Sequence, residues 1–125
     1  MLGNKDTMAT IPVRDVRAAR KFYEDVLGLE LVSPEMPEAP VYQSGKSKVL
    51  VYQSQYAGTN KATAATWSVG RDIEKVVQGL RAKGVTFEHY DMPSLQRNGD
   101  LFVGKNMKVA WLKDPDGNIL ALAGE

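Results

Sequence analysis

Hydrophobic residues recur with a helical period in two places along the chain, once in each half. Each of these stretches begins after an aspartate, Asp15 or Asp72, and ends at a glycine, Gly28 or Gly84. Aspartate is a favoured N-cap, and glycine is a favoured residue just beyond a helix C-terminus. The pattern therefore predicts two helices. Their apolar positions are Val16, Ala19, Tyr23, Val26 and Leu27 in the first, and Ile73, Val76, Val77 and Leu80 in the second.

Short runs of β-prone residues precede and follow each helix. Glycine-containing turns separate some of these runs, at Gly45-Lys46 and at residues 114–118, and such turns are typical of hairpins. The predicted strands are residues 9–13, 29–32, 41–44 and 48–53 in the first half, and residues 65–69, 85–89, 108–113 and 119–123 in the second.

The two halves repeat one another. Arg14-Asp15-Val16 and Arg71-Asp72-Ile73 stand at matching places, and each opens a β-α-β-β-β unit. We therefore expect an α+β fold in which two βαβββ modules, residues 8–53 and 63–124, form a curved mixed sheet with the helices outside and a concave pocket inside. Residues 54–62 are the predicted linker, and residues 1–125 form one domain.

Two irregular segments interrupt this symmetry. Residues 91–107 form a connection long enough to suggest either a function or disorder, and Leu101-Phe102-Val103 within it reads as a short strand or a lid segment. An earlier connector carries Pro34, Pro37 and Pro40 and reads as an ordinary loop or a flap. The role of residues 91–107 stays open.

Alternation along the first strand of each module predicts which side chains face the helix and which face the pocket. The expected helix-facing residues are Ala9, Ile11, Val13, Ala65, Trp67 and Val69. The expected pocket-facing residues are Met8, Thr10, Pro12, Ala64, Thr66 and Ser68.

Composition narrows the range of functions. The chain has 16 Lys and Arg against 15 Asp and Glu, without the basic surplus of a nucleic-acid binder. No apolar run is long enough to span a membrane, and residues 1–7 lack the apolar core of a signal peptide. The absence of cysteine excludes a thiolate nucleophile and a disulfide. A cytoplasmic protein, binding neither nucleic acid nor membrane, is the expectation.

Two motifs resemble those of a known family. One is the run I-P-V-R-D-x₃-A-x-x-F-Y-x-D-x-L-G-L from Ile11 to Leu29, and the other is the run from Ala110 to Leu120 around Asp114-Pro115-Asp116-Gly117. In this order and spacing they resemble the opening module and closing hairpin of the glyoxalase/bleomycin-resistance protein/extradiol dioxygenase family, the vicinal-oxygen-chelate superfamily. The resemblance covers residues 8–123 and implies a homodimer.

Enzymes of that family hold a divalent metal with His, Gln or Glu side chains at four inward strand positions. The resemblance places these positions on residues with poor or no metal donors. We therefore expect neither a metal nor a cofactor at the family site. The positions are Met8, Ala64 (or Ala65 if Gly70 is a bulge), Ala121, and Val51 (or Gln53 if the register shifts).

A few further residues allow two interpretations, a functional one and a structural one. His89, the only histidine, is either a pocket or general-base group or an ordinary residue at a strand end. Trp111 and the tyrosines Tyr42 and Tyr52 could stack on a ligand or lie in the core, and Trp67 reads as core. Turn chemistry explains the Asp114 run better than catalysis does. The predicted ligand pocket comprises Met8, Thr10, Val51, Gln53, Ala64, Thr66, His89, Trp111 and Ala121.

Three functions compete on these observations. The first is a metal-independent protein that binds a small molecule, either a drug or a metabolite. The second is a metal-dependent lyase or isomerase of the glyoxalase type, with relocated ligands recruited from Gln53, Glu88, His89 and Asp91. The third is an auxiliary or structural protein that acts through its dimer surface, a reading favoured if the chain's own side chains fill the pocket.

Overall fold

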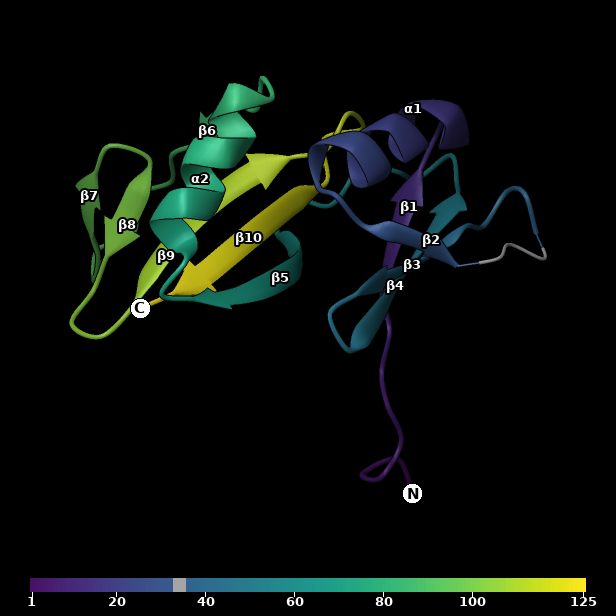
Figure 1. Cartoon of the computed structure of the whole chain (residues 1–125), viewed down its shortest axis with the longest axis horizontal. Coiled ribbons are helices and arrows are strands. Elements are labelled where there is room, and N and C mark those ends of the chain that lie inside the picture. Colours follow the sequence, from purple (N-terminus) through teal and green to yellow (C-terminus); the bar gives the residue numbers. More distant parts are fainter. Residues whose placement is uncertain (33–35) are drawn as a thin grey trace. The chain divides into compact units, whose positions relative to one another are not determined.

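The computed structural model describes residues 1–32 and 36–125. The chain divides into two compact units, Met1–Ala57 and Gly58–Glu125, and each is considered by itself. The described residues form two helical segments and two mixed sheets (Figure 1). The predicted α+β class, with its repeated arrangement of strands and one helix, is confirmed.

Unit 1 contains a four-stranded sheet in the order β1-β4-β3-β2. β1 runs parallel to β4, and the other neighbours are antiparallel. A parallel pair needs a crossover connection, and the helical segment after β1 begins that crossover. The elements are β1 (Ala9–Val13), α1 (Val16–Arg20), η1 (Lys21–Val26), β2 (Glu30–Val32), β3 (Val41–Ser44) and β4 (Ser47–Gln53).

The first helix begins as predicted but changes its winding half-way. Asp15 caps it, because its carboxylate accepts hydrogen bonds from the backbone N–H groups of Arg17 and Ala18. From Lys21 onward the helix is π-helical, and the N–H of Leu27 donates to the carbonyl of Phe22, five residues back. The sequence predicted a single α-helix here. Over six residues, the spacing of hydrophobic positions does not distinguish an α-helix, with about 3.6 residues per turn, from a π-helix with wider turns.

The core of unit 1 lies between this helix and one face of the sheet. Ile11 and Val51 are opposite one another on β1 and β4, and both are fully buried. Tyr23 from the helix stacks on Tyr42 from β3, with ring centroids 6.2 Å apart, and both are also fully buried. The helix therefore covers this face of the sheet, and no helix among the described residues of unit 1 covers the other face.

Unit 2 repeats the arrangement with additions. Its sheet has the order β5-β10-β9-β8-β7, and β6 pairs with β9. β5 is parallel to β10, as β1 is to β4 in unit 1. The elements are β5 (Thr63–Gly70), α2 (Ile73–Ala82), β6 (Phe87–Glu88), β7 (Gln96–Asn98), β8 (Leu101–Val103), β9 (Lys108–Lys113) and β10 (Ile119–Gly124).

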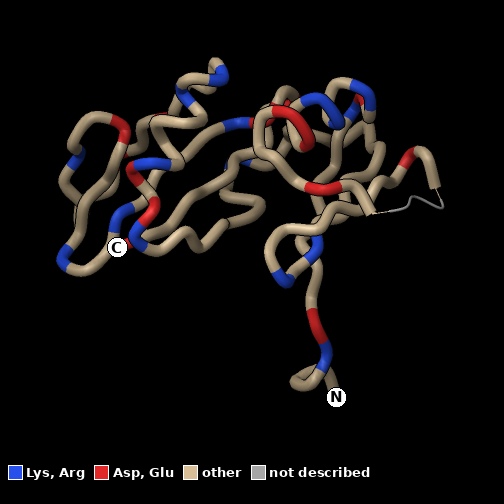
Figure 2. Tube along the Cα trace, viewed as in Figure 1, with Lys and Arg blue, Asp and Glu red and all other residues tan. Residues whose placement is uncertain are grey.

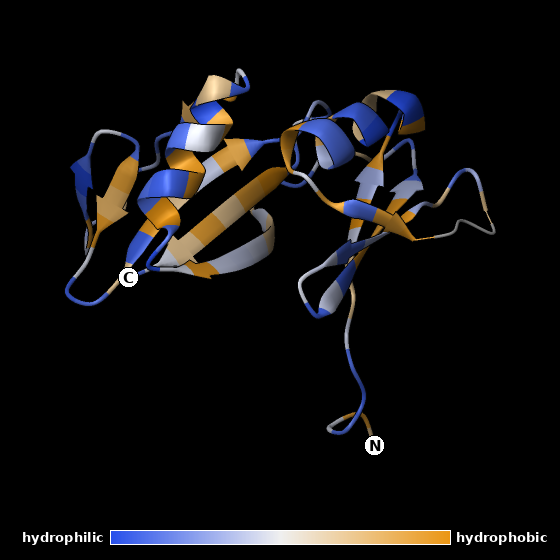
Figure 3. Ribbon diagram, in the orientation of Figure 1, coloured by the Kyte–Doolittle hydropathy of each residue, from blue (hydrophilic) through white to orange (hydrophobic). Residues whose placement is uncertain are grey.

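Helix α2 lies across β5, β9 and β10 and covers one face of this sheet (Figure 1). Ile73, Val77 and Leu80 are the buried residues of the helix, in agreement with the predicted apolar stripe. Figure 3 shows hydrophobic residues along much of β9 and β10, which are the most deeply buried strands of this unit. Strands that are buried on both faces are expected to be apolar without alternation.

The turn between β9 and β10 has the structural role that turn chemistry predicted. Asp114 is buried, and its carboxylate accepts hydrogen bonds from the N–H groups of Asp116 and Asn118 and from the Asn118 amide. Gly117 has a φ of 90°, which glycine adopts most readily. Asn118 in turn accepts from the N–H of Gly58. The Asp114 carboxylate thus holds the closing hairpin in shape.

Several predicted features differ in detail from the structure. The strand predicted at residues 85–89 is reduced to β6, because residues beyond Glu88 leave the edge of β9 where β8 pairs instead. Residues 91–107 contain a hairpin of β7 and β8, so the strand reading of Leu101–Val103 is confirmed. Asp72 precedes α2 as expected, but its side chain makes no capping hydrogen bond.

The prolines of the first connector are only partly described. Pro37 lies in a turn and Pro40 directly precedes β3, whereas Pro34 lies outside the described residues. Within residues 1–32 and 36–125, no helix has the length and apolar character needed to cross a membrane. Figure 2 shows Lys and Arg as well as Asp and Glu scattered along the tube, as the balanced composition suggested.

Two glycines of unit 2 are expected to respond oppositely to alanine. A Cβ at Gly124 would lie 2.4 Å from the carbonyl oxygen of Gly70 and 2.9 Å from the Cβ of Ile73, so Gly124→Ala should lower the thermal midpoint. A Cβ at Gly79, in the middle of α2, meets nothing within 4 Å. Gly79→Ala should stabilise the protein by up to about 1 kcal/mol, because alanine favours the helix. Calorimetric melting of both variants tests this, and a stabilising Gly124→Ala would contradict the close packing.

Candidate functional site

The face of the unit 1 sheet that the helix leaves free is the first candidate surface. Thr10 pairs with Leu50 and Pro12 with Tyr52, one step out of phase with the buried pair Ile11 and Val51. Paired residues share a face, so these four side chains lie on the side away from the helix. Val41, opposite Leu50, extends the set. We call Thr10, Pro12, Val41, Leu50 and Tyr52 the unit 1 open face.

Tyr52 is the exposed aromatic residue of this face, with 37% of its surface accessible. Thr10 is also exposed, and its hydroxyl donates to the carbonyl of Met8, 3.1 Å away. Met8 is 41% exposed and continues the Thr10 side of β1 by alternation. The structure thus separates the two tyrosines that the sequence left ambiguous: Tyr42 lies in the core, and Tyr52 lies on the open face.

Two residues predicted for the pocket do not join this set. Val51 is fully buried beside Ile11 on the helix side, so it faces away from Thr10. The sequence prediction was wrong for Val51 because successive residues of β4 face opposite sides of the sheet, and a register error of one residue assigns each to the wrong side. Gln53 is exposed at the end of β4, opposite Val13, and its backbone N–H donates to the carbonyl of Glu38.

The helix-free face of the unit 2 sheet is the second candidate surface. Ala121 on β10 lies between Thr66 on β5 and Trp111 on β9, and Trp111 lies opposite Glu88 on β6. We call Thr63, Thr66, Glu88, Trp111 and Ala121 the unit 2 open face. Three residues of the predicted pocket, Thr66, Trp111 and Ala121, therefore lie on one surface.

Aromatic side chains of the chain itself fill part of the unit 2 open face. Trp111 is only 8% exposed, because Tyr90 and Phe102 pack edge-on against its ring with centroids 5.4 and 5.1 Å away. Its indole N–H donates to the hydroxyl of Thr63, 3.3 Å away. Trp111 is therefore core rather than an open platform for stacking.

Thr63 was not expected at this surface from the sequence. The register between β5 and β10 shifts after Thr63, so that Ile119 pairs with Thr63 and Leu120 with Ala65. Ala64, exposed in this irregularity, is passed over in the pairing. Strict alternation fails where a strand carries an extra residue, and nothing in the residue types marks this one.

Tyr90 brings an unusual group to the edge of the unit 2 open face. Its hydroxyl is buried and has no hydrogen-bond partner among the described residues. Burial raises the pKa of Tyr90, and the nearby charge of Glu88 raises it further, whereas Lys113 lowers it. Lys113 pairs with Glu88 at 3.6 Å. The hydroxyl therefore stays protonated at neutral pH and is able to donate to a polar partner.

His89 belongs to a charged cluster at the start of β8 and not to either open face. Its Nε2 lies 2.7 Å from a carboxylate oxygen of Asp100, and its Nδ1 contacts the guanidinium of Arg97. A guanidinium can only donate, so Nδ1 accepts, and Nε2–H donates to Asp100. Arg81 from α2 binds the other oxygen of Asp100. Both ring nitrogens of His89 are thus engaged, which leaves neither free to take a proton from a substrate.

The hydrogen bond from His89 and that from Arg81 hold the pKa of Asp100 below its ordinary value, against the opposing effect of partial burial. Asp100 therefore stays ionised and joins the turn between β7 and β8 to both α2 and the end of β6. The cluster fixes the hairpin of residues 96–103 to the rest of unit 2.

The residues that the resemblance assigns to the family metal positions do not fit a divalent metal. Met8 offers a thioether, Ala64 and Ala121 offer no donor, and Val51 lies in the core. Of the relocated ligands considered above, Glu88 pairs with Lys113, and His89 pairs with Asp100 and Arg97. Within the described parts of the chain, no group of three or more His, Asp or Glu side chains is arranged to hold a metal.

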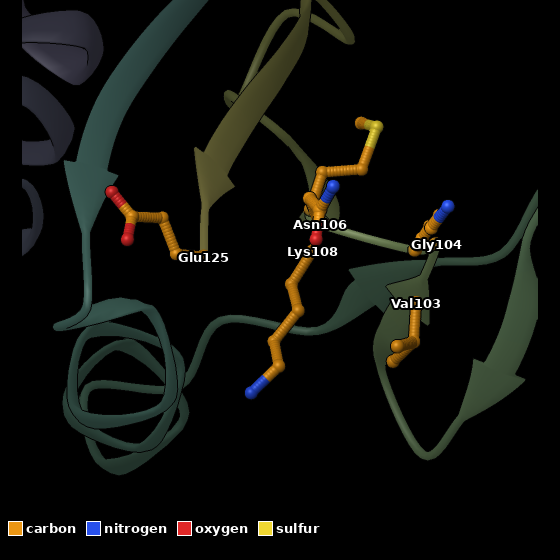
Figure 4. Close-up of a pocket in the computed structure, with 7 residues that line it drawn as sticks. Val103, Gly104, Asn106, Lys108 and Glu125 are labelled. Atoms are coloured by element: carbon orange, nitrogen blue, oxygen red, sulfur yellow. The ribbon is translucent and has the colours of Figure 1, made fainter.

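A separate pocket of about 590 Å³ lies at the turn between β8 and β9 (Figure 4). Lys108 crosses it toward α2, where its ammonium pairs with Glu74 at 2.7 Å and lowers the pKa of that carboxyl. Residues of both charge signs line the pocket, so it favours neither anions nor cations. Its lining residues are Val103, Gly104, Lys105, Asn106, Met107, Lys108 and Glu125.

Comparison with known proteins agrees with this arrangement of strands and helices. The family model of the glyoxalase/bleomycin resistance protein/dioxygenase superfamily matches residues 7–122. The chain belongs to this superfamily. The resemblance seen in the sequence is thereby confirmed, and the repeated βαβββ pattern is the fold that it implied.

Solved structures give the same fold at low sequence identity. Lactoylglutathione lyase from Agrobacterium tumefaciens is 19% identical, with a TM-score of 0.72 over 98% of this chain and 95% of that one. The fosfomycin resistance protein FosX from Listeria monocytogenes is 11% identical, with a TM-score of 0.70 over 98% and 91% of the two chains. A virulence protein from Salmonella typhimurium is 21% identical, with a TM-score of 0.68 over 99% and 98%. No curated protein matches by sequence search.

Because His89 and Arg81 stabilise the ionised form of Asp100, we expect the stability of the folded protein to fall in acid. The folded-state pKa of Asp100 lies below the ordinary value of 3.8, so its contribution is fully present above that pH and is lost as the pH falls through the folded-state pKa. The thermal midpoint of Asp100→Asn should therefore lie below that of the wild type at neutral pH, and the gap should narrow below about pH 4. Asp91→Asn, an exposed control, should show no such narrowing. A pH-independent gap would contradict the assignment.

Replacement of Tyr90 by phenylalanine tests the state of its hydroxyl. An unpaired buried hydroxyl costs about 1–3 kcal/mol, so Tyr90→Phe, which keeps the ring against Trp111, should leave stability unchanged or raise it slightly. Urea unfolding followed by tryptophan fluorescence measures the change. A loss of more than about 1 kcal/mol would show that the hydroxyl has a hydrogen-bond partner in solution.

Proposed function

We propose that this protein binds a small molecule, a drug or a metabolite, without the help of a metal. The observation that carries the proposal is the chemistry of the unit 1 open face. Met8 stands where the family's first metal ligand would stand, and beside it lies an exposed surface with one aromatic ring, one hydroxyl and apolar side chains. Such a surface suits an organic ligand better than a hard or borderline cation.

The side chains of this face indicate the kind of ligand. The ring of Tyr52 can stack on a planar or apolar group, and Leu50 adds apolar contact. The hydroxyl of Thr10 donates its proton to the carbonyl of Met8, so it is left to accept a hydrogen bond from a ligand. No charged side chain belongs to the five residues of the face. These five side chains therefore favour an apolar or weakly polar part of the ligand, of a size similar to the tyrosine ring. Glu30 and Lys48 lie farther along the same side of the sheet, because they are in phase with Val41 and Leu50.

The named relatives support a role in handling small molecules. FosX carries the name of a fosfomycin resistance protein, and the Agrobacterium tumefaciens protein that of a lactoylglutathione lyase. We propose further that the protein works as a homodimer in the cytoplasm, with modules 8–53 and 63–124 in one domain. Light scattering of the purified protein measures the oligomeric state directly.

The metal-dependent lyase is the alternative, and the described residues give it little support. The imidazole that it would need in the place of the family ligands is held by Asp100 and Arg97. The auxiliary or structural reading gains from the aromatic filling around Trp111. The exposed unit 1 open face nevertheless favours binding, since a purely structural domain has no need of an accessible tyrosine there.

The first experiment is calorimetry of chelator-treated protein with bleomycin, fosfomycin and a panel of aromatic metabolites. We expect saturable binding to at least one of them without added metal. Tyr52→Ala should weaken it by several-fold and up to about tenfold, because a stacked ring contributes about 1 kcal/mol beyond its buried area. Tyr56→Ala, another exposed tyrosine outside the sheet, is the matched control.

Two outcomes would replace the proposal. Formation of lactoylglutathione that disappears with chelator and returns with Ni²⁺ or Zn²⁺ would establish the lyase. If the protein binds no compound of the panel, and if Tyr52→Ala leaves the oligomeric state unchanged, the hypothesis of an auxiliary or structural protein would be favoured.

A further inference from the structure

A groove on the helix side of unit 1 lies outside every residue considered for the family site. It has a volume of about 320 Å³, within the range of pockets that hold small ligands. Helix α1 forms one wall, and β2 with residues 37–40 forms the other. The groove is lined by Val16, Arg17, Arg20, Leu31, Pro37 and Pro40.

The groove and the unit 1 open face lie on opposite sides of the same sheet. Leu31 on β2 pairs with Tyr42, which stacks on Tyr23 of the helix, so Leu31 faces the helix side. Thr10 and Tyr52 face the other way. A ligand in the groove would therefore not compete for the surface proposed above.

The apolar wall is held in place by backbone hydrogen bonds. The N–H of Val51 donates to the carbonyl of Pro40 at 2.9 Å, and the N–H of Gln53 donates to that of Glu38 at 3.0 Å. These bonds fix the segment to β4, and the proline rings restrict φ at two of its positions. Such a wall loses little conformational freedom when a ligand binds, and this preorganisation favours affinity.

Two arginines supply the charge of the groove. Arg17 has no ion pair or side-chain hydrogen bond among the described residues. Arg20 is oriented by Glu24, whose carboxylate accepts from its Nε at 2.8 Å and also from the hydroxyl of buried Tyr42 at 2.8 Å. No carboxylate is among the six lining residues. Among the described residues, the groove therefore presents the unpaired guanidinium of Arg17 beside an apolar wall.

We propose that this groove binds an amphipathic monoanion, a carboxylate that carries a short alkyl chain or an aromatic ring. The carboxylate pairs with the Arg17 guanidinium, whose planar fork of N–H donors matches two carboxylate oxygens. The apolar part lies against Val16, Leu31 and Pro40. Arg20 also lines the groove, and its ion pair with Glu24 fixes its orientation.

The test uses the full chain, labelled with ¹⁵N, and sodium octanoate as the probe. Backbone shifts during a titration should be saturable and concentrated at residues 16–20 and at Leu31. Arg17→Gln should weaken octanoate binding by about tenfold, as expected for the loss of a charge-assisted pair. Arg14→Gln, an exposed arginine that does not line the groove, is the matched control and should leave the affinity unchanged.

Two further measurements separate the charged and apolar parts of the ligand. Octanamide, which lacks the charge, should bind the wild type more weakly than octanoate and should be insensitive to Arg17→Gln. Val16→Thr, which keeps the shape but adds a hydroxyl, should weaken octanoate more than acetate.

The proposal is overturned if octanoate shifts Thr10 and Tyr52 in place of the groove residues, if Arg14→Gln and Arg17→Gln weaken it equally, or if no saturable shift occurs. The same spectra distinguish this site from the unit 1 open face, so the two proposals can fail separately.

Discussion

In each unit the first strand pairs in parallel with the last, β1 with β4 and β5 with β10. The rest of the structure depends on this pairing. A parallel pair requires a crossover, the crossover contains the helix, and the helix buries one face of the sheet. The opposite face is then left for other uses. Whether a side chain is core or candidate site is decided by its phase along these paired strands.

The sequence could predict the helices and strands because hydrophobic residues recur with different periods in the two kinds of element. The stripe Ile73, Val77 and Leu80 is buried as its spacing indicated, and alternation correctly assigned Thr10 and Ile11 to opposite faces. The site was harder to predict, because a register error of one residue moves a side chain to the other face. Val51 was misplaced in this way, and Thr63 was missed because the strand pairing shifts beside it.

The cluster around His89 and Asp100 lay beyond any sequence pattern. Arg81, Arg97 and Asp100 come from a helix, a short strand and a turn, and only the folded chain brings them together. The groove beside Arg17 has the same origin, since its walls are separated by more than ten residues along the chain. Periodicity reports how a residue relates to its own element. It does not report which other elements come within reach of that residue.

The parallel pairing also orders events during synthesis. β1 cannot complete its hydrogen bonds until residues as far as Gln53 have left the ribosome, and β5 must wait for β10 at the end of the chain. All strand pairs of the first sheet lie before residue 54, so that sheet has its full set of strands while the second is still being translated. β5 carries exposed Thr and Ser residues, and these polar groups protect an edge that stays unpaired the longest.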